Sequence, residues 1–184
     1  MGRTFPIEPR GVIHAIRPPQ FRDHAPTQES NLAPDTTQDA TREVVDALGR
    51  LLATSYTLYL KTHNYHWNVT GTMFTTLHTM FETQYTELAL AVDEIAERIR
   101  ALDAYAPGSF AEFTRLSAVK EEAGHPMAVD MVRALAADQR AVETSARAVI
   151  HAAEVAGDQA SADLGTRRLQ IHEKNGWMLR SHLA

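Results

Sequence analysis

Two histidines and three carboxylates able to bind a metal ion fall within one short stretch of this 184-residue chain. They are His66, His78, Glu82, Asp93 and Glu97. Imidazole and carboxylate ligands suit iron, manganese or zinc, and the complete absence of cysteine points away from a structural zinc site. Carboxylates can hold iron in both of its common oxidation states, because they offset the added positive charge.

The spacing of these residues does not fit a site within one subunit. His78 and Glu82 are one helical turn apart, as are Asp93 and Glu97, and both pairs fall on what reads as one unbroken helix. Fifteen positions separate the pairs, which at ~1.5 Å of rise per residue is about 22 Å. Side chains cannot span that distance to a common ion. The second pair must therefore come from another copy of the chain.

A helical wheel at about 100° per residue places these four residues on one stripe about 100° wide. The neighbouring sector of the wheel is apolar and consists of Leu77, Phe81, Tyr85, Leu88, Val92, Ile95 and Ile99. A two-fold axis crossing the helix near Glu87 or Leu88 brings each pair opposite the other pair of a second subunit, and two-fold dimers are the commonest oligomers. His66, at the end of the preceding helix, is placed to join His78.

The elements that must position these residues all show helical periodicity, and no segment alternates as a strand does. The first helix is expected to start at Thr37 or Asp39, residues that suit an N-cap, and to end before Gly71. The second helix is expected over residues 74–102, and it carries the metal-binding stripe.

A long connection follows the second helix, with DAYAPGS as a loop and FAEFTRL as a short helix. A third helix is expected over residues 127–156, with Pro126 near its first turn and Gly157 closing it. A fourth helix should start at Asp158 or Ser161 and end near the C-terminus. The sequence therefore predicts an all-α fold: a ferritin-like four-helix bundle with a short helix in the second-to-third crossover.

Residues 1–37 are expected to form a flexible tail, which leaves residues 38–184 as the bundle. The tail holds six of the eight prolines and shows no helical periodicity. The whole chain carries a net charge of −5, and the lack of cysteine excludes disulfides and thiol catalysis. No apolar run approaches the ~20 residues of a membrane span, and no secretory signal is recognisable, so a cytoplasmic location is expected.

Two segments closely resemble the Dps family (DNA-binding protein from starved cells), the miniferritins of the ferritin superfamily. They are KTHNYHWNVTGTMFTTLHTMFETQYTELALAVDEIAERI and LGTRRLQIHEKNGWMLRSHL, and the resemblance covers roughly residues 38–184. It implies a hollow dodecameric shell with di-iron ferroxidase centres at two-fold interfaces. Carried over by position, the ligands are His66, His78 and Glu82 of one subunit with Asp93 and Glu97 of its mate.

The resemblance also implies an activity. Such centres oxidise Fe(II), preferentially with hydrogen peroxide, and ferric mineral is stored in the shell, which protects the cell and its DNA from oxidative damage. Iron is the expected metal, although one or both positions of the centre can hold another divalent ion. Trp67, beside His66, is expected to be a buried aromatic at the helix end; the alternative is that it packs on the site and quenches stray radicals.

Four further residues have two interpretations each. We interpret His63 and His172 as packing or hydrogen-bonding residues; the alternative is that either one is an extra metal ligand or supports a ligand at the metal site. Asp158 and Asp163, near the start of the fourth helix, either line an iron-uptake pore or simply favour the helix dipole.

DNA binding is expected to be weak and strongly salt-dependent, because the chain is acidic and its tail arginines are balanced by acids. The alternative function is a non-enzymatic nucleoid-packing protein, which the five residues at matching spacing argue against. A conventional diiron bundle needs two Glu-x-x-His motifs, and this chain has one, from Glu122 to His125 in a predicted loop. A metal-dependent hydrolase would need an arrangement such as HExxH, which is missing from the sequence.

Overall fold

The structure is a computed structural model that describes residues 36–184. Within these residues the chain forms five helices and no strand. Their bounds are α1 Thr36–Asn68, α2 Phe74–Ala101, α3 Phe110–Leu116, α4 Ala128–Ala156 and α5 Gln159–Ser181. The tail expected over residues 1–37 lies outside the described residues, apart from its last two, which belong to α1. None of the described helices is long and apolar enough to cross a membrane.

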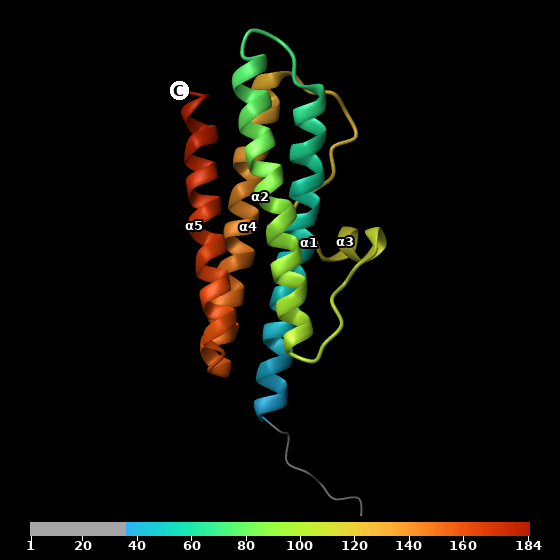
Figure 1. Cartoon of the computed structure of the whole chain (residues 1–184), viewed down its shortest axis with the longest axis vertical. Coiled ribbons are helices and arrows are strands. Elements are labelled where there is room, and N and C mark those ends of the chain that lie inside the picture. Colours follow the sequence, from blue (N-terminus) through green and yellow to red (C-terminus); the bar gives the residue numbers. More distant parts are fainter. Residues whose placement is uncertain (1–35) are drawn as a thin grey trace, which may run out of the picture. The chain divides into compact units, whose positions relative to one another are not determined.

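The four long helices pack side by side as a bundle (Figure 1). α1 packs along α2, α4 packs along α5, and α1 also contacts α4. α2 and α4 run in the same direction, so their connection has to return along the bundle, and α3 lies on this path beside α1. Phe113 of α3 stacks on Tyr56 of α1 with 4.7 Å between the ring centroids. The expected four-helix bundle with a short crossover helix is therefore confirmed.

The apolar stripe predicted for α2 faces the core. Its fully buried members are Leu77, Phe81, Leu88, Ile95 and Ile99. Burying each large apolar side chain contributes roughly 1.5–3 kcal/mol, so this stripe fixes the rotation of α2 about its axis. The neighbouring outer face of the helix, which carries the three candidate carboxylates, is exposed in the single chain.

Two of the predicted helix boundaries agree with the capping geometry. Gly157 has a left-handed φ of 69° and ends α4, a conformation that favours glycine. Asp158 then caps α5, because its side chain accepts a hydrogen bond from the backbone N–H of Ser161. Gly71 lies in the turn after α1 with a φ of 105°, which again requires a glycine.

One predicted helix start is wrong, and another is confirmed. α1 begins at Thr36, before both expected caps, so Asp39 lies inside its first turn, where its charge favours the helix dipole. α4 begins at Ala128, and Met127 is its N-cap with extended backbone angles. This start agrees with the expected one, and Pro126 lies directly before the N-cap.

Candidate metal centre

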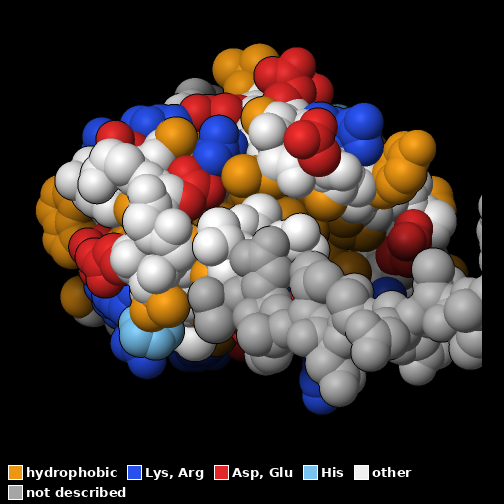
Figure 2. Space-filling model, turned by 90° about the horizontal axis from the view of Figure 1, so that it is seen from below, with side chains coloured by type: hydrophobic (Ala, Val, Ile, Leu, Met, Phe, Trp, Pro, Cys, Tyr) orange, Lys and Arg blue, Asp and Glu red, His pale blue; other side chains and the backbone are white. Residues whose placement is uncertain are grey.

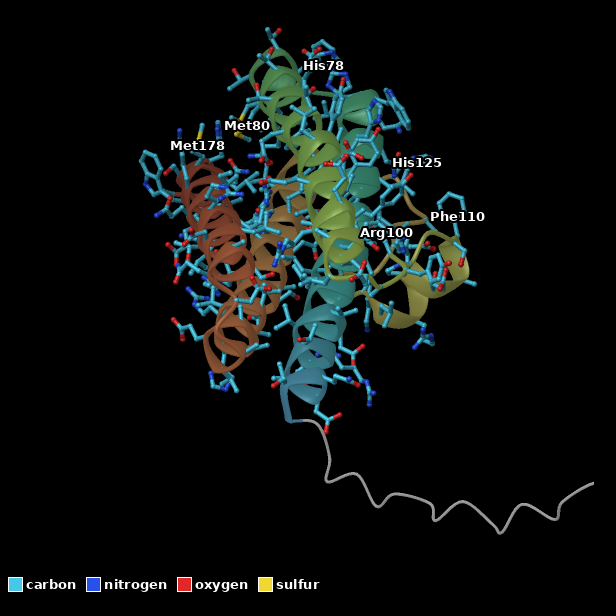
Figure 3. The ribbon with its side chains drawn as sticks, turned by 60° about the horizontal axis from the view of Figure 1, so that its bottom comes forward. His78, Met80, Arg100, Phe110, His125 and Met178 are labelled. Atoms are coloured by element: carbon cyan, nitrogen blue, oxygen red, sulfur yellow. The ribbon has the colours of Figure 1, made fainter. Side chains whose placement is uncertain are left out.

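His66, near the end of α1, and His78, in the second turn of α2, lie against each other across the turn that contains Gly71. Nδ1 of His66 lies 2.9 Å from the main-chain oxygen of His78, and Nδ1 of His78 lies 2.9 Å from the main-chain oxygen of His66. The two rings stack with their centroids 3.8 Å apart. Figure 3 shows His78 near the end of α2 that adjoins the turn.

These two hydrogen bonds determine which nitrogen of each ring can bind a metal. A carbonyl oxygen only accepts, so Nδ1 donates in both rings. In a neutral imidazole the other nitrogen, Nε2, then carries the lone pair. A hydrogen bond from one ring nitrogen to a carbonyl oxygen is a common way to orient a metal-binding histidine. The hydrogen bonds therefore leave Nε2 of His66 and Nε2 of His78 as the nitrogens that could bind a metal.

The three candidate carboxylates, Glu82, Asp93 and Glu97, are exposed on the outer face of α2. None of them takes part in an ion pair within residues 36–184. Glu97 also lines a shallow groove between α2 and α5, which contains Asp163. The outer face of α2 therefore carries three carboxylates that form no ion pair within the described chain.

One chain does not assemble the predicted centre by itself. Over the described residues, no three His, Asp or Glu side chains are grouped so as to hold a metal ion. The fold brings His66 and His78 together and leaves Asp93 and Glu97 farther along α2, which runs unbroken from Phe74 to Ala101. A single subunit therefore keeps the two halves of the predicted centre apart, as a site divided between two subunits would require.

His63, one turn before His66, is packed between two aromatic rings. Its ring centroid lies 3.9 Å from that of Tyr85 and 4.0 Å from that of Trp67. Burial, followed by the charge of the nearby His66, lowers the pKa of His63. These contacts agree with the packing interpretation. Trp67 is 59% exposed, so its expected burial is wrong: one side of its ring packs on His63 and the rest is open to solvent.

A polar network that the sequence did not predict crosses the interior of the bundle. Arg168 of α5 is 2% exposed and pairs with Glu87 of α2, and its guanidinium also lies 2.9 Å from Nε2 of His172. Nδ1 of His172 lies 2.6 Å from Oε1 of Gln139 on α4. Both ring nitrogens of His172 are therefore engaged, which agrees with a hydrogen-bonding role. Burial, followed by the charge of Arg168, lowers the pKa of His172 to about 3.

This network also bears on the conventional diiron alternative. Such bundles project glutamates and Glu-x-x-His motifs inward around two metal ions. Here the guanidinium of Arg168 is buried in the interior, and Glu87 neutralises its charge. The one Glu-x-x-His motif lies in the loop before α4, where Glu122 accepts a hydrogen bond from the Tyr65 hydroxyl at 3.3 Å. Within residues 36–184, the bundle interior therefore shows no metal centre of that type.

Asp158 is occupied by local contacts. Arg98 donates to it at 2.7 Å, and Ser161 donates to it through both its backbone N–H and its hydroxyl. Burial alone would raise the pKa of Asp158, but these hydrogen bonds lower it. Figure 2 shows acidic and basic side chains intermixed at this end of the bundle. Asp163 is exposed and accepts a hydrogen bond from Gln159 at 2.7 Å; its role in an iron-uptake pore stays a prediction.

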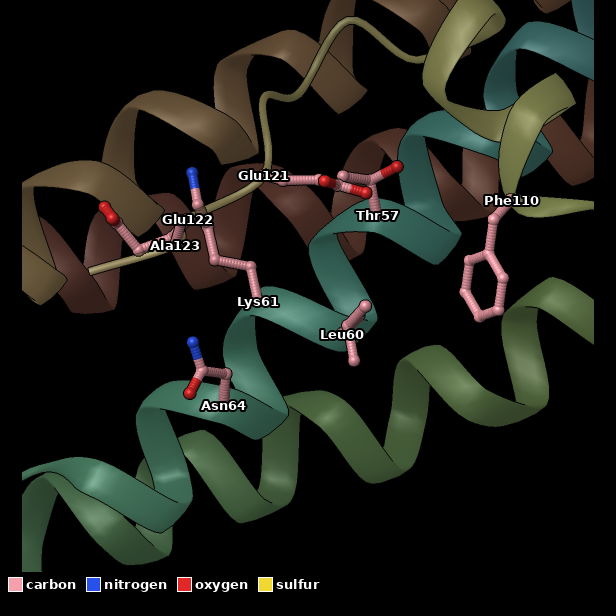
Figure 4. Close-up of a pocket in the computed structure, with 8 residues that line it drawn as sticks. All are labelled: Thr57, Leu60, Lys61, Asn64, Phe110, Glu121, Glu122 and Ala123. Carbon is pink, nitrogen blue, oxygen red and sulfur yellow. The ribbon is translucent and has the colours of Figure 1, made fainter. Parts of the chain in front are cut away.

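A pocket of about 280 Å³ lies between α1, α3 and the loop before α4 (Figure 4). Its lining includes Lys61, Asn64, Phe110 and Glu122. The ammonium group of Lys61 is already paired with Asp138 at 2.8 Å. None of the five candidate ligands lines this pocket, so it does not belong to the metal centre.

Comparisons with known proteins identify the family of this chain. Residues 45–184 match the ferritin-like domain of the Ferritin family. The DNA protection during starvation protein 2 of Bacillus anthracis is 34% identical over 142 residues, which are 77% of this chain and 97% of that protein. The chain belongs to the Dps family.

Solved Dps structures have the same fold. Dps from Thermosynechococcus elongatus is 31% identical, with a TM-score of 0.79 over 82% of this chain and 96% of that one. The Dps protein of Vibrio cholerae, described as a member of a broad superfamily of ferritin-like diiron-carboxylate proteins, is also 31% identical. Its TM-score is 0.76 over 79% of this chain and 92% of that one.

Proposed function

We propose that this Dps-family protein oxidises Fe(II) with hydrogen peroxide at centres shared by two subunits, and stores the ferric product in a dodecameric shell. One observation carries the proposal: His66 of α1 and His78 of α2 form a pair whose Nε2 atoms are left to bind metal, and the outer face of α2 bears three carboxylates without an ion pair. On an ordinary solvated helix face, the rings of His66 and His78 would not need to be held by hydrogen bonds to each other's backbone.

A two-fold axis between positions 87 and 88 of α2 completes the centre. It places His78 opposite Glu97 of the partner subunit, and Glu82 opposite Asp93 of the partner subunit. The unpaired acids of one subunit then meet a cation bound by the imidazoles of the other. Each dimer has two such centres, and neither exists in a lone chain.

The residues have separate tasks in the reaction. Fe(II) is the substrate, and His66 and His78 bind it through Nε2, while the carboxylates bind it with hard oxygen donors. Each of two Fe(II) ions gives one electron to one hydrogen peroxide molecule, which takes up two protons and leaves as two water molecules. The negative charge of Glu82, Asp93 and Glu97 favours the ferric product over the ferrous substrate. Because peroxide is reduced by two electrons, hydroxyl radical is not released.

The test is anaerobic loading with Fe(II), addition of peroxide, and measurement of ferric absorbance. We expect His78→Ala and Asp93→Ala to lower the initial rate at least about 100-fold, since even residues that only orient metal ligands are worth 10- to 100-fold. Glu94→Gln is the matched control, because Glu94 is an exposed acid of the same helix that pairs with Arg167 off the stripe. Undiminished oxidation in both site variants would overturn the assignment.

DNA binding is the second candidate function, and the names of several relatives refer to DNA protection. The charge of this chain gives it little support. The chain has three lysines, and Lys61 is 8% exposed and paired with Asp138, so it is not available to phosphate groups. We therefore expect DNA binding to be weak, and a nucleoid-packing role without iron chemistry to be the poorer account.

A further inference from the structure

We propose that α2 carries a self-complementary seam of small residues, in which Thr86 and Ala89 set the distance between the two halves of each metal centre. The inference rests on the proposed two-fold pairing and names the residues that make it close enough for a shared ion. It assigns a positioning role to residues that have no metal-binding group.

The exposed face of α2 lacks basic side chains over most of its length. Positions 75–97 contain no lysine or arginine, whereas solvated helix faces usually mix both signs of charge. Apart from the candidate ligands and Glu94, which pairs with Arg167 at the edge, the exposed residues of this stretch are uncharged. They are Thr75, Thr76, Thr79, Thr83, Thr86, Ala89 and Leu90. Leu90, beside the seam, is 73% exposed in the single chain.

The second observation is the spacing of the seam. Its positions alternate by four and three residues, which is the repeat of two helices packed along their length. They are Thr75, Thr79, Glu82, Thr86, Ala89, Asp93, Ala96 and Arg100. The two-fold axis that places Glu82 opposite the partner's Asp93 also places Thr79 opposite the partner's Ala96, and Thr86 opposite the partner's Ala89. The seam shares Glu82 and Asp93 with the metal stripe, and its small residues pair in the same register as these two candidate ligands.

Small side chains at the point where the two α2 helices cross affect the distance between the two halves of the metal site. Packed helices lie about 8 to 10 Å apart, depending on the side chains at the contact. Alanine facing threonine allows the short end of this range. A metal–ligand bond tolerates a deviation of only about 0.2 Å, so the carboxylates of one subunit and the imidazoles of the other can share an ion only at the correct helix separation.

Disulfide trapping tests the register, because the chain has no cysteine of its own. A disulfide needs Cβ atoms about 3.5–4.5 Å apart. Thr79 and Ala96 lie 17 positions apart on one helix, or about 25 Å. The double variant Thr79→Cys/Ala96→Cys should therefore form covalent dimers under mild oxidation, while each single variant stays monomeric on a denaturing gel. Covalent dimers in either single variant, or none in the double variant, would overturn the register.

Substitution of Ala89 tests the spacing. Ala89 is exposed, so Ala89→Leu leaves the core of the subunit unchanged, but it widens the crossing by about 1 Å or more. A misplacement of that size costs about 100-fold in rate, so we expect the rate of peroxide-dependent Fe(II) oxidation to fall by about this factor. In the absence of peroxide, we also expect fewer Fe(II) ions to bind per dimer. Two control variants, Ala89→Ser and Thr83→Leu, should retain both the oxidation rate and the number of bound Fe(II) ions. Thr83 lies off the seam. Equal activity in Ala89→Leu and Thr83→Leu would contradict the spacing role.

These experiments separate the inference from the proposed function. Disulfide trapping needs no iron, so covalent dimers of the double variant would support the seam even if the wild-type protein oxidised no Fe(II). In that case the ferroxidase proposal fails and the interface stands. Conversely, wild-type oxidation without covalent dimers in the double variant would retain the activity and overturn the seam.

Discussion

His66 and His78 each donate a hydrogen bond from Nδ1 to the main-chain oxygen of the other, both at 2.9 Å. This reciprocal contact ties the end of α1 to the beginning of α2 and leaves Nε2 of both rings free of these two hydrogen bonds. In the proposed function, the structural and the chemical roles of the two histidines therefore use different nitrogens, and substitution can separate them.

His78→Asn should keep the structure and lose the chemistry. The asparagine amide can donate to the His66 carbonyl as Nδ1 does, but it has no group in the place of Nε2. We expect its thermal unfolding to match the wild type, with Fe(II) oxidation lost. His78→Ala removes the hydrogen bond as well and should cost about 1 kcal/mol of stability. His125→Asn, in the exposed loop before α4, controls for loss of a histidine. Wild-type oxidation by His78→Asn would show that Nε2 is not a ligand.

His172 should make stability fall as the pH falls. Its pKa is about 3 in the folded chain, against an ordinary value of 6.5. Between these values the unfolded chain binds a proton that the folded chain does not, so the folded state loses up to about 1.4 kcal/mol per pH unit below pH 6.5. Above that pH the contribution is constant. We expect His172→Gln to be less stable than wild type at pH 7.5, with a gap that narrows toward pH 4.5.

Urea unfolding at fixed protein concentration measures this gap, because assembly makes apparent stability depend on concentration. The other titratable groups contribute equally to both proteins and cancel in the comparison. A gap between wild type and His172→Gln that stays constant from pH 7.5 to pH 4.5 would show that His172 titrates normally in the folded chain.

The buried ion pair between Lys61 and Asp138 should be sensitive to loss of one partner. Nζ and Oδ2 lie 2.8 Å apart, and the side chains are 8% and 15% exposed. Lys61→Met leaves an unpaired carboxylate in the interior and should cost about 3 to 5 kcal/mol. Burial already raises the pKa of Asp138 against the opposing effect of Lys61, so the cost should shrink at acidic pH as the carboxyl group takes up a proton.

The double variant Lys61→Met/Asp138→Asn is the control for this pair. It removes both charges, and we expect it to recover most of the stability lost in Lys61→Met at neutral pH. Denaturant unfolding of the three proteins gives the comparison. If Lys61→Met alone were as stable as wild type, the pair would not be desolvated as the structure places it.

DNA binding should be weak and should disappear as salt rises. The basic residues at the N-terminus are Arg3, Arg10, Arg17 and Arg22, and their charge is offset by nearby acids. With few phosphate contacts per chain, affinity for duplex DNA should fall steeply between about 50 and 200 mM salt. Replacing the four arginines with glutamine should abolish the remaining band shift. Tight binding above physiological salt would contradict this expectation.

Much of the fold was predictable because burial leaves a periodic trace in the sequence. The spacing of Phe81, Leu88 and Ile95 gave the core face of α2, and the fixed rise of a helix showed that Asp93 lies too far from His78 to share an ion within one chain. Gly157 and Asp158 marked the boundary between α4 and α5, because a left-handed residue and an N-cap are local requirements.

Features that depend on contacts between helices were not predictable in this way. The reciprocal bonds of His66 and His78 require the conformation of the turn between their helices. Arg168 and His172 share the buried face of α5 with Leu164 and Leu179, so periodicity places them in the core, but it does not identify Glu87 as the partner of Arg168. The exposure of Trp67 depends on where α1 ends.

The central claim is that each metal centre belongs to two subunits, and reassembly of two inactive variants tests it most directly. His78→Ala and Asp93→Ala are each inactive because every centre lacks a ligand. After dissociation and mixing in equal amounts, half of the dimers are mixed, and each mixed dimer has one intact centre, so random pairing restores about one quarter of the wild-type rate. A mixture as inactive as its two components, with mixed dimers present, would contradict a shared centre.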